Sequence, residues 1–277
     1  MAYEDLIYER RGFTAWITLN RPKQLNALRE NLVRELYSAL EEAERSEDVR
    51  VVVLRGAGRA FSAGYDLVEE AKIATSQQWR NHLDLDIRTT MKVWDMPKPV
   101  IAAVHGYCLA GACELAMACD LTIAAEDAVL GEPEIRFGSG PVTLIMPWVL
   151  GLKKTRELLY TGDTLDAREA ERLGMVNRVV PADKLEEEVQ KVADKIAKVP
   201  PEVMKLTKIP LNRCYEMTGL KEAIAYNLEA SSLLNSVQVE EQVEFNSIVR
   251  ERGLKAALEW RDNRYQEKVA RMNAKRG

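Results

Sequence analysis

The sequence predicts an α/β fold, in which short strands alternate with longer helices up to about residue 180. Short apolar runs rich in Val and Ile recur in this part of the chain, and stretches with apolar residues at helical spacing separate them. From Ala182 onward the pattern becomes almost wholly helical. With 277 residues and 47% hydrophobic content, the chain can bury the sizeable core that such a fold requires.

The elements of the first region follow from this alternation in chain order. We expect strands over residues 6–9, 14–19, 51–55, 100–104 and 121–124. We expect helices over residues 31–46, 77–95 and 111–119. Because helical crossovers connect strands that run in the same direction, this order predicts a sheet with many parallel strands.

The second region is predicted to be a series of amphipathic helices. They are expected over residues 184–198, 201–214, 220–235, 239–252 and 261–271, with turn signals at Pro200 and Gly219. Leu185, Val189 and Ile196 recur at helical spacing, which indicates a face that packs on the core or on another subunit. We therefore divide the chain into a core over residues 1–182 and a helical region over residues 183–277.

Composition and charge exclude several classes of function. The net charge is −4, and Lys and Arg are mixed with Asp and Glu along the chain, so neither a nucleic-acid partner nor a membrane-surface role is expected. No apolar run approaches membrane-spanning length, and the first residues lack a leader pattern, so a cytoplasmic location is expected. The four cysteines and two histidines lack metal-ligand spacing, which favours buried free thiols and no metal site.

Two segments have the pattern of an oxyanion hole, which is a pair of backbone N–H groups that stabilise a negatively charged oxygen. Residues 61–67 and 105–114 each follow an apolar run and place Gly or Ala where a strand should turn into a helix. Small residues there let a ligand approach the backbone closely. The helix expected to begin at Gly111 adds unpaired N–H groups and the positive end of its dipole.

Carboxylates lie close to these segments in the sequence. Glu114 would occupy the first turn of the helix that begins at Gly111, where a glutamate often serves only the helix dipole. Glu132 and Glu134 flank Pro133 in an expected loop, where solvated charges are routine. Two carboxylates beside an oxyanion hole would nevertheless permit general acid and base catalysis on a carbonyl compound.

The chain resembles the crotonase, or enoyl-CoA hydratase, superfamily. The resemblance begins with the Asn-Arg-Pro and Asn-Ala-Leu triplets of residues 20–28 and includes the Ser-Ala-Gly-Tyr-Asp-Leu and Gly-Ala-Cys-Glu motifs. It continues through residues 161–163 to the spaced motif that contains Ala170, Gly174 and Asn177. It implies a spiral of β-β-α turns with a C-terminal helical region that joins subunits into homotrimers or hexamers.

The resemblance also implies roles for individual residues. It assigns the oxyanion hole to the backbone N–H groups of Tyr65 and Gly111, and the acid and base roles to Glu114 and Glu134, so that water adds to a 2-enoyl-CoA thioester. Glu134 would supply the proton to the α-carbon, and the Tyr65 side chain is a candidate to line the acyl pocket. No separate cofactor is implied, because coenzyme A is part of the substrate. Coenzyme A would lie along Lys23, Leu25, Ala27, Ala63, Gly64, Asp66 and Leu67.

Two departures from the family pattern keep other activities open. Glu132 stands where the hydratase pattern has glutamine, and the bulky segment 139–148 replaces a glycine-rich one. The segment either shapes the acyl pocket, favouring an acyl group other than a simple straight chain, or packs into a buried helix. Isomerase, retro-aldol lyase, dienoyl-CoA hydratase or thioester hydrolase chemistry therefore remains an alternative, as does a non-catalytic acyl-CoA-binding or RNA-binding role.

Overall fold

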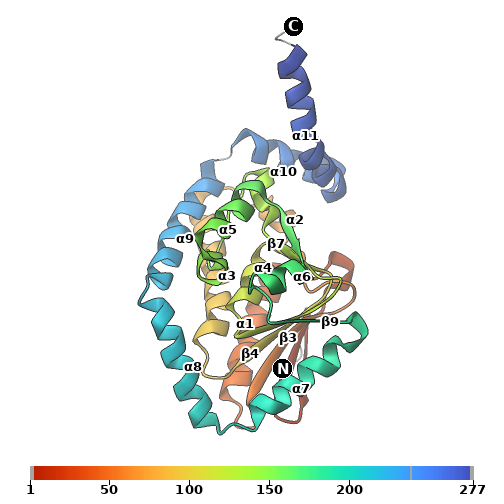
Figure 1. Cartoon of the computed structure of the whole chain (residues 1–277). Coiled ribbons are helices and arrows are strands. Elements are labelled where there is room, and N and C mark those ends of the chain that lie inside the picture. The colour runs from red at the N-terminus through yellow and green to blue at the C-terminus, as the bar shows by residue number, and fades with distance from the viewer. Residues whose placement is uncertain (1–2, 238, 275–277) are drawn as a thin grey trace.

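A computed structural model describes residues 3–237 and 239–274. Two sheets form its centre, and helices surround them (Figure 1). The strands are β1 (Leu6–Arg11), β2 (Thr14–Leu19), β3 (Val51–Gly56), β4 (Val100–Val104), β5 (Tyr107–Leu109), β6 (Leu121–Ala125), β7 (Val129–Gly131), β8 (Thr164–Asp166) and β9 (Arg178–Val180). The core helices are α1 (Glu30–Arg45), α2 (Leu67–Glu70), α3 (Ser76–Asp95), α4 (Gly111–Ala118), α5 (Met146–Thr161) and α6 (Ala167–Arg172). Short 3-10 helices are η1 (Pro22–Gln24), η2 (Pro133–Phe137) and η3 (Ala182–Lys184), and the C-terminal helices are α7 (Leu185–Ala197), α8 (Pro201–Glu216), α9 (Leu220–Val237), α10 (Glu240–Arg252) and α11 (Leu254–Ala274).

The larger sheet has the strand order β1-β2-β3-β4-β6-β9, and the smaller one has the order β5-β7-β8. Strands β2, β3, β4, β6 and β9 run parallel, as the alternating pattern predicts. β1 instead pairs antiparallel with β2, because only a tight turn separates the two strands. β8 also runs antiparallel to its neighbour β7.

The chain winds as a spiral of β-β-α turns. β4 lies in the larger sheet, β5 lies in the smaller one, and α4 leads back to β6 in the larger sheet. The next turn repeats this course from β6 to β7 before α5. The expected spiral is confirmed, and it brings the ends of successive turns together at the small sheet.

Helices cover both faces of the larger sheet. Apolar side chains of α7, including Val189 and Ala193, pack on one face with Trp16 and Val53. Helices α1 and α3 contribute to the larger core on the other face. The helix α7 therefore belongs physically to the layer that covers the sheet, although it follows residue 182.

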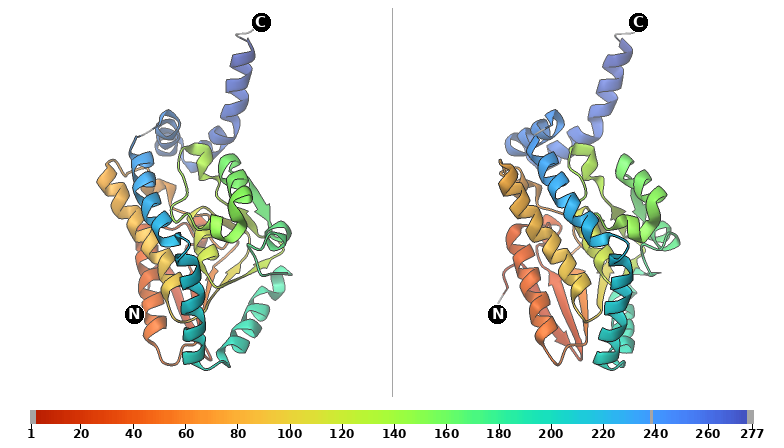
Figure 2. Two further views of the ribbon diagram at one scale, coloured as in Figure 1. Left: turned by 60° about the vertical axis from the view of Figure 1, so that its left-hand side comes forward. Right: turned by 90° about the vertical axis from the view of Figure 1, so that its left-hand side faces the viewer.

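Helices α8 and α9 run along the outside of the molecule, and α11 projects from it (Figures 1 and 2). Helix α9 lies beside α3, with which it shares extensive contacts. The last helix begins at Leu254 rather than at the expected residue 261, because the chain resumes a helix directly after Gly253, whose φ is +84°. Within residues 3–237 and 239–274, no helix combines the length and apolar content needed to cross a bilayer.

The cysteine prediction holds for part of the set. Cys108 and Cys113 are buried free thiols, and Cys119 is half-buried. Cys214 is exposed instead, because it lies on α8 at the outside of the molecule, away from the strand-to-helix region of the other three.

Candidate active site

Backbone pairing brings the two glycine-containing segments together. Ser62 forms an isolated parallel bridge with Cys108 of β5. The N–H of Ser62 donates to the Tyr107 carbonyl at 3.0 Å, and the N–H of Leu109 donates to the Ser62 carbonyl at 3.1 Å. The segment 61–67 therefore extends the small sheet alongside β5, and both segments turn at the same edge of that sheet.

The turn is too crowded for a side chain on Gly64. Its φ is +93°, and a Cβ there would lie 2.8 Å from the Cβ of Ala110. Ala110 itself has a φ of +52°, a strained value for a residue other than glycine, directly before Gly111 begins α4. Strain of this kind is found where the surrounding structure fixes the backbone for function.

Two N–H groups remain for an oxyanion at this edge. Leu28 donates to the Gly64 carbonyl at 2.8 Å, and Asp66 donates to the Leu28 carbonyl at 3.2 Å, so the N–H of Tyr65 between them points away from Leu28. Gly111 is the first residue of α4, where the helix provides no acceptor for the N–H. Tyr65 and Gly111 remain the predicted donors of an oxyanion hole.

The predicted coenzyme A residues divide into two groups. Ala63 donates its N–H to the Leu25 carbonyl at 3.0 Å, and Gly64 pairs with Leu28, so half-buried Leu25, Ala27 and Ala63 lie beside buried Gly64. Lys23 is exposed on η1. Leu67 instead packs with the apolar cluster of α10 and α11.

Asp66 has a structural role in addition to its predicted contact with coenzyme A. Its side chain accepts the Val68 N–H at 3.2 Å and so caps the N-terminus of α2. It also pairs with the guanidinium of Arg21 at 3.0 Å. The carboxylate is therefore engaged by the protein, and so is the backbone of Asp66, whose carbonyl accepts the N–H groups of Glu69 and Glu70.

Buried Asn26 holds the 20–28 segment in place. Its amide donates to the carbonyls of Ala57 and Ala60 at 2.8 Å each, and its oxygen accepts the Arg21 N–H at 2.9 Å. Asn26 has a φ of +55°, a conformation that asparagine tolerates better than most residues. We singled out neither Asn26 nor Arg21 from the sequence, although both stand in the motif that carried the resemblance.

The three glutamates are buried together. Glu114 is fully buried on α4, and Glu132 and Glu134 are buried before and within η2. One oxygen of Glu114 accepts the N–H of Thr143 at 2.7 Å. The other oxygen, like one oxygen each of Glu132 and Glu134, has no hydrogen-bond partner among the described residues. These oxygens can therefore bind a water or a substrate atom.

Burial raises the pKa of all three carboxyl groups. Loss of hydration raises the pKa of Glu114 to about 8. Burial, then the charge of Glu114, raises the pKa of Glu134 well above its usual range, and burial and both neighbouring glutamates do the same for Glu132. A carboxyl group with a raised pKa keeps a proton closer to neutral pH, as a general acid requires.

The side chain of Tyr65 crosses the site. Its ring lies so close to Gly111 that a Cβ at that position would collide with it. Its hydroxyl lies in the field of Asp86 and Glu114, which, after burial, raise the pKa of the phenol well above its usual value. The side chain therefore packs against the first residue of α4, close to the acids.

The divergent segment packs into the core and supports the site. Ile145 and Met146 are buried in the main core, so for them the buried-helix interpretation holds. The Nε1–H of Trp148 donates to the Thr218 hydroxyl at 2.9 Å, away from the glutamates. Asn227 of α9 donates to the carbonyls of Pro141 and Val142 at 2.8 and 2.9 Å, which fixes the loop that carries Thr143.

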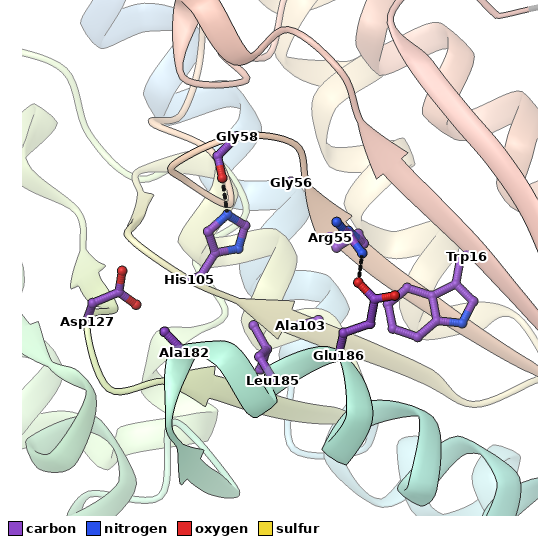
Figure 3. A pocket seen from close by; sticks show the side chains of 10 residues that line it. All are labelled: Trp16, Arg55, Gly56, Gly58, Ala103, His105, Asp127, Ala182, Leu185 and Glu186. Carbon is purple, nitrogen blue, oxygen red and sulfur yellow. Dashed lines mark hydrogen bonds and ion pairs between the residues drawn. The ribbon is translucent and has the colours of Figure 1, made fainter.

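A second cavity lies on the other face of the larger sheet (Figure 3). It measures about 200 Å³ and is lined by Trp16, Arg55, His105 and Glu186, among others. Arg55 is paired with Glu186, and His105 Nε2 lies 3.0 Å from the Gly58 carbonyl. Arg55, Glu186 and His105 are thus engaged by the protein, whereas one oxygen of each of the three buried glutamates has no partner among the described residues.

The fold and this site define an enzyme-like centre in which two backbone donors face a group of buried acids. A family model described as Enoyl-CoA hydratase/isomerase matches residues 9–268. A probable mitochondrial enoyl-CoA hydratase of Dictyostelium discoideum is 40% identical over 221 residues, which are 79% of this chain and 78% of that protein. A crotonyl-CoA hydratase of Syntrophomonas wolfei subsp. wolfei is 34% identical over 242 residues, 86% of this chain and 92% of that protein.

A solved structure agrees over nearly the whole length. The crystal structure of an enoyl-CoA hydratase/isomerase from Xanthobacter autotrophicus Py2 has a TM-score of 0.93 and 43% identity, covering 95% of this chain and 99% of that chain. The chain therefore belongs to the enoyl-CoA hydratase/isomerase family. The resemblance inferred from the sequence motifs is confirmed.

Proposed function

We propose that the protein is an enoyl-CoA hydratase, which adds water to a 2-enoyl-CoA thioester and removes it in the reverse direction. The observation that carries the proposal is the pair of buried glutamates, Glu114 and Glu134, in the same region as Tyr65 and Gly111; each has an oxygen without a hydrogen-bond partner in the described part of the chain. A protein that only binds acyl-CoA or RNA has no need for such acids, because unpaired buried carboxyl groups cost stability.

The chemistry follows from these positions. The N–H groups of Tyr65 and Gly111 bind the thioester oxygen and stabilise the negative charge it gains as water adds to the β-carbon. Glu114 and Glu134 hold the water, and whichever of these two carboxyl groups is ionised takes a proton from the water. Glu134 delivers a proton to the α-carbon, which neutralises the enolate. Loss of one oxyanion donor is expected to cost about 10² to 10³ in turnover.

The test is hydration of crotonyl-CoA, followed by the loss of enoyl-thioester ultraviolet absorbance, with products identified by mass. We expect a product heavier by one water, and we expect Glu114→Gln and Glu134→Gln to lose the activity while remaining folded. Glu126→Gln is the matched control, because Glu126 is exposed. A product of unchanged mass would instead identify a double-bond isomerase, and cleavage would identify a lyase or a hydrolase.

The proposal extends to the assembly of the protein. Helices α8 and α9 expose large apolar side chains: Leu206 is 62%, Leu211 58%, Tyr226 78% and Leu233 63% exposed. Such surfaces favour a subunit interface, and we propose a homotrimer or a hexamer. Sedimentation would test this, and a monomer at micromolar concentration would contradict it.

We also propose a cytoplasmic location and no cofactor beyond the coenzyme A of the substrate. Free thiols at Cys108, Cys113, Cys119 and Cys214 support a reducing compartment. Activity after exhaustive dialysis against a chelator tests the cofactor part, and loss of activity that a metal restores would contradict it.

A further inference from the structure

A polar pair on α3 stands apart from the residues assigned to the hydration reaction. His82 and Asp86 lie one helical turn apart, on the face of α3 that is turned toward the core. The Asp86 carboxylate is fully buried, and the side chain of His82 is 9% exposed. His82 Nε2 lies 3.5 Å from Asp86 Oδ2 and 3.7 Å from Glu70 Oε1 of α2. The two residues stand four apart within the expected helix 77–95, and this spacing could have indicated from the sequence that they share one face.

His82 and Asp86 form no hydrogen bond with each other. His82 Nε2 and both carboxylate oxygens of Asp86 are buried without a hydrogen-bond partner among the described residues. At 3.5 Å His82 and Asp86 form an ion pair without a hydrogen bond, although burying polar groups without hydrogen bonds is costly. Three polar atoms of two neighbouring side chains are thus available to one ligand.

The aromatic ring of Tyr65 connects the pair to the oxyanion hole. The rings of Tyr65 and His82 meet edge to face, with centroids 6.3 Å apart. The same Tyr65 ring covers Gly111. The pair therefore lies about one aromatic ring beyond Gly111, a residue of the proposed thioester site. Trp79 packs against the opposite side of His82, with ring centroids 6.1 Å apart.

We infer that His82 and Asp86 form a recognition site for a hydroxyl group on the acyl chain of the substrate. This inference rests on the proposed acyl-CoA function, and it names the substrate class: acyl-CoA thioesters with a hydroxyl several carbons from the thioester. The hydroxyl oxygen accepts from His82 Nε2–H, and its proton is donated to Asp86. One hydroxyl thereby satisfies both a donor and an acceptor.

The surrounding charges distinguish a hydroxyl from other polar groups. The carboxylate of Glu70 lies 3.7 Å from His82 Nε2, so a second carboxylate on the acyl chain would be repelled there. A carbonyl group could accept from His82 but would leave Asp86 without a donor. Burial lowers the pKa of His82, but contact with Glu70 and the charge of Asp86 outweigh it and raise the pKa to about 9, so His82 is a donor at neutral pH.

The first experiment measures binding without turnover. The dissociation constants of hexanoyl-CoA, 5-hydroxyhexanoyl-CoA and 6-hydroxyhexanoyl-CoA are compared by calorimetry on the wild-type protein. These saturated thioesters cannot be hydrated, so the result does not depend on the proposed reaction. We expect a hydroxylated thioester to bind about tenfold more tightly than hexanoyl-CoA.

Variants show whether the pair is responsible. Asp86→Leu and His82→Leu should each abolish the preference for the hydroxyl while leaving hexanoyl-CoA binding within about twofold. Asp84→Leu, at a half-exposed position of the same helix, should keep the preference. If Asp86→Leu does not fold, Asp86→Asn and His82→Leu provide the same comparison, with a melting curve for each variant.

The outcomes separate this inference from the proposed function. Equal affinities for all three thioesters in the wild type, or a preference that survives in both His82→Leu and Asp86→Leu, would overturn the inference even if crotonyl-CoA is hydrated. A hydroxyl preference that the pair controls would uphold it. Failure to hydrate any enoyl-CoA would overturn only the hydratase proposal.

Discussion

The backbone N–H of Thr143 donates to the carboxylate of Glu114 at 2.7 Å and thereby fixes one of its two oxygens. The loop that presents Thr143 is itself held by α9, whose Asn227 and Ser231 donate to the carbonyls of Pro141 and Val142. A helix of the C-terminal region thus controls the position of an acid in the core. The first prediction tests this connection.

Asn227→Leu should lower kcat more than it raises KM, because it frees the loop that orients Glu114 without touching the oxyanion hole. A misplaced catalytic group can cost about 10²-fold in rate, and we expect about tenfold here because Ser231 remains. Steady-state kinetics on crotonyl-CoA measures the effect. Glu229→Gln, on the exposed surface of the same helix, is the control. Unchanged kcat in Asn227→Leu would show that the loop holds its position without α9.

Gly111→Ala should reduce activity through a collision with Tyr65. The added Cβ meets the phenol ring, so the ring or the start of α4 must shift, although the N–H of residue 111 is retained. We expect a loss of at least about tenfold in kcat, since an oxyanion donor is displaced. In a Tyr65→Ala background the collision is absent, and Gly111→Ala should have little further effect. An equal loss in both backgrounds would mean that the ring is not the cause.

Glu132→Gln should stabilise the protein, and the gain should grow with pH. Burial and the charges of Glu114 and Glu134 raise the pKa of Glu132 above its ordinary value of 4.5. The folded state therefore keeps a proton that the unfolded state releases, and the free energy of unfolding of the wild type falls as pH rises above 4.5. Glutamine cannot ionise and escapes this penalty.

Melting temperatures between about pH 5 and about pH 9 measure the difference between Glu132→Gln and the wild type. The exposed-site substitution Glu126→Gln provides the comparison at a residue without burial. A difference that is constant over this range, or that shrinks as pH rises, would contradict the prediction.

Lys208→Ala should destabilise the fold without affecting chemistry. Lys208 is buried on α8, and its Nζ donates to Asp120 at 2.7 Å and to the carbonyls of Val93 and Lys98 at 3.1 Å each. Removing one partner of a buried pair costs about 3 kcal/mol, because the other charge loses its counterion. Urea unfolding should show this loss, whereas Lys205→Ala at an exposed position should cost about 0.5 kcal/mol or less. A similar small cost for both variants would show that the buried pair is not stabilising.

The regular elements were predictable because their signals are local. Helix 77–95 and strand 100–104 were expected within one residue of the observed bounds of α3 and β4, since apolar periodicity records which face each segment buries. The antiparallel directions of β1 and β8 were not predicted, because strand direction depends on how the connections cross in space. The four-residue helix α2 was equally invisible to periodicity.

The site was predictable where its residues stand in continuous motifs. Tyr65, Gly111 and Glu114 belong to two short segments with recognisable turn and helix signals. Asn227 and the pair of His82 and Asp86 come from separate helices, and only packing brings them near the glutamates. The burial of Glu132 was not predicted either, because a loop carboxylate next to proline is ordinarily solvated.

The contact between Gly64 and Ala110 joins segments that lie far apart in the chain. Neither segment alone holds a usable pair of oxyanion donors, so catalytic competence arises only after the long-range pairing of Ser62 with β5 is complete. Recovery of turnover during refolding should therefore lag behind the return of helical signal, because contacts between distant segments form more slowly than helices. The time at which activity returns therefore reports when the turns of the spiral have paired.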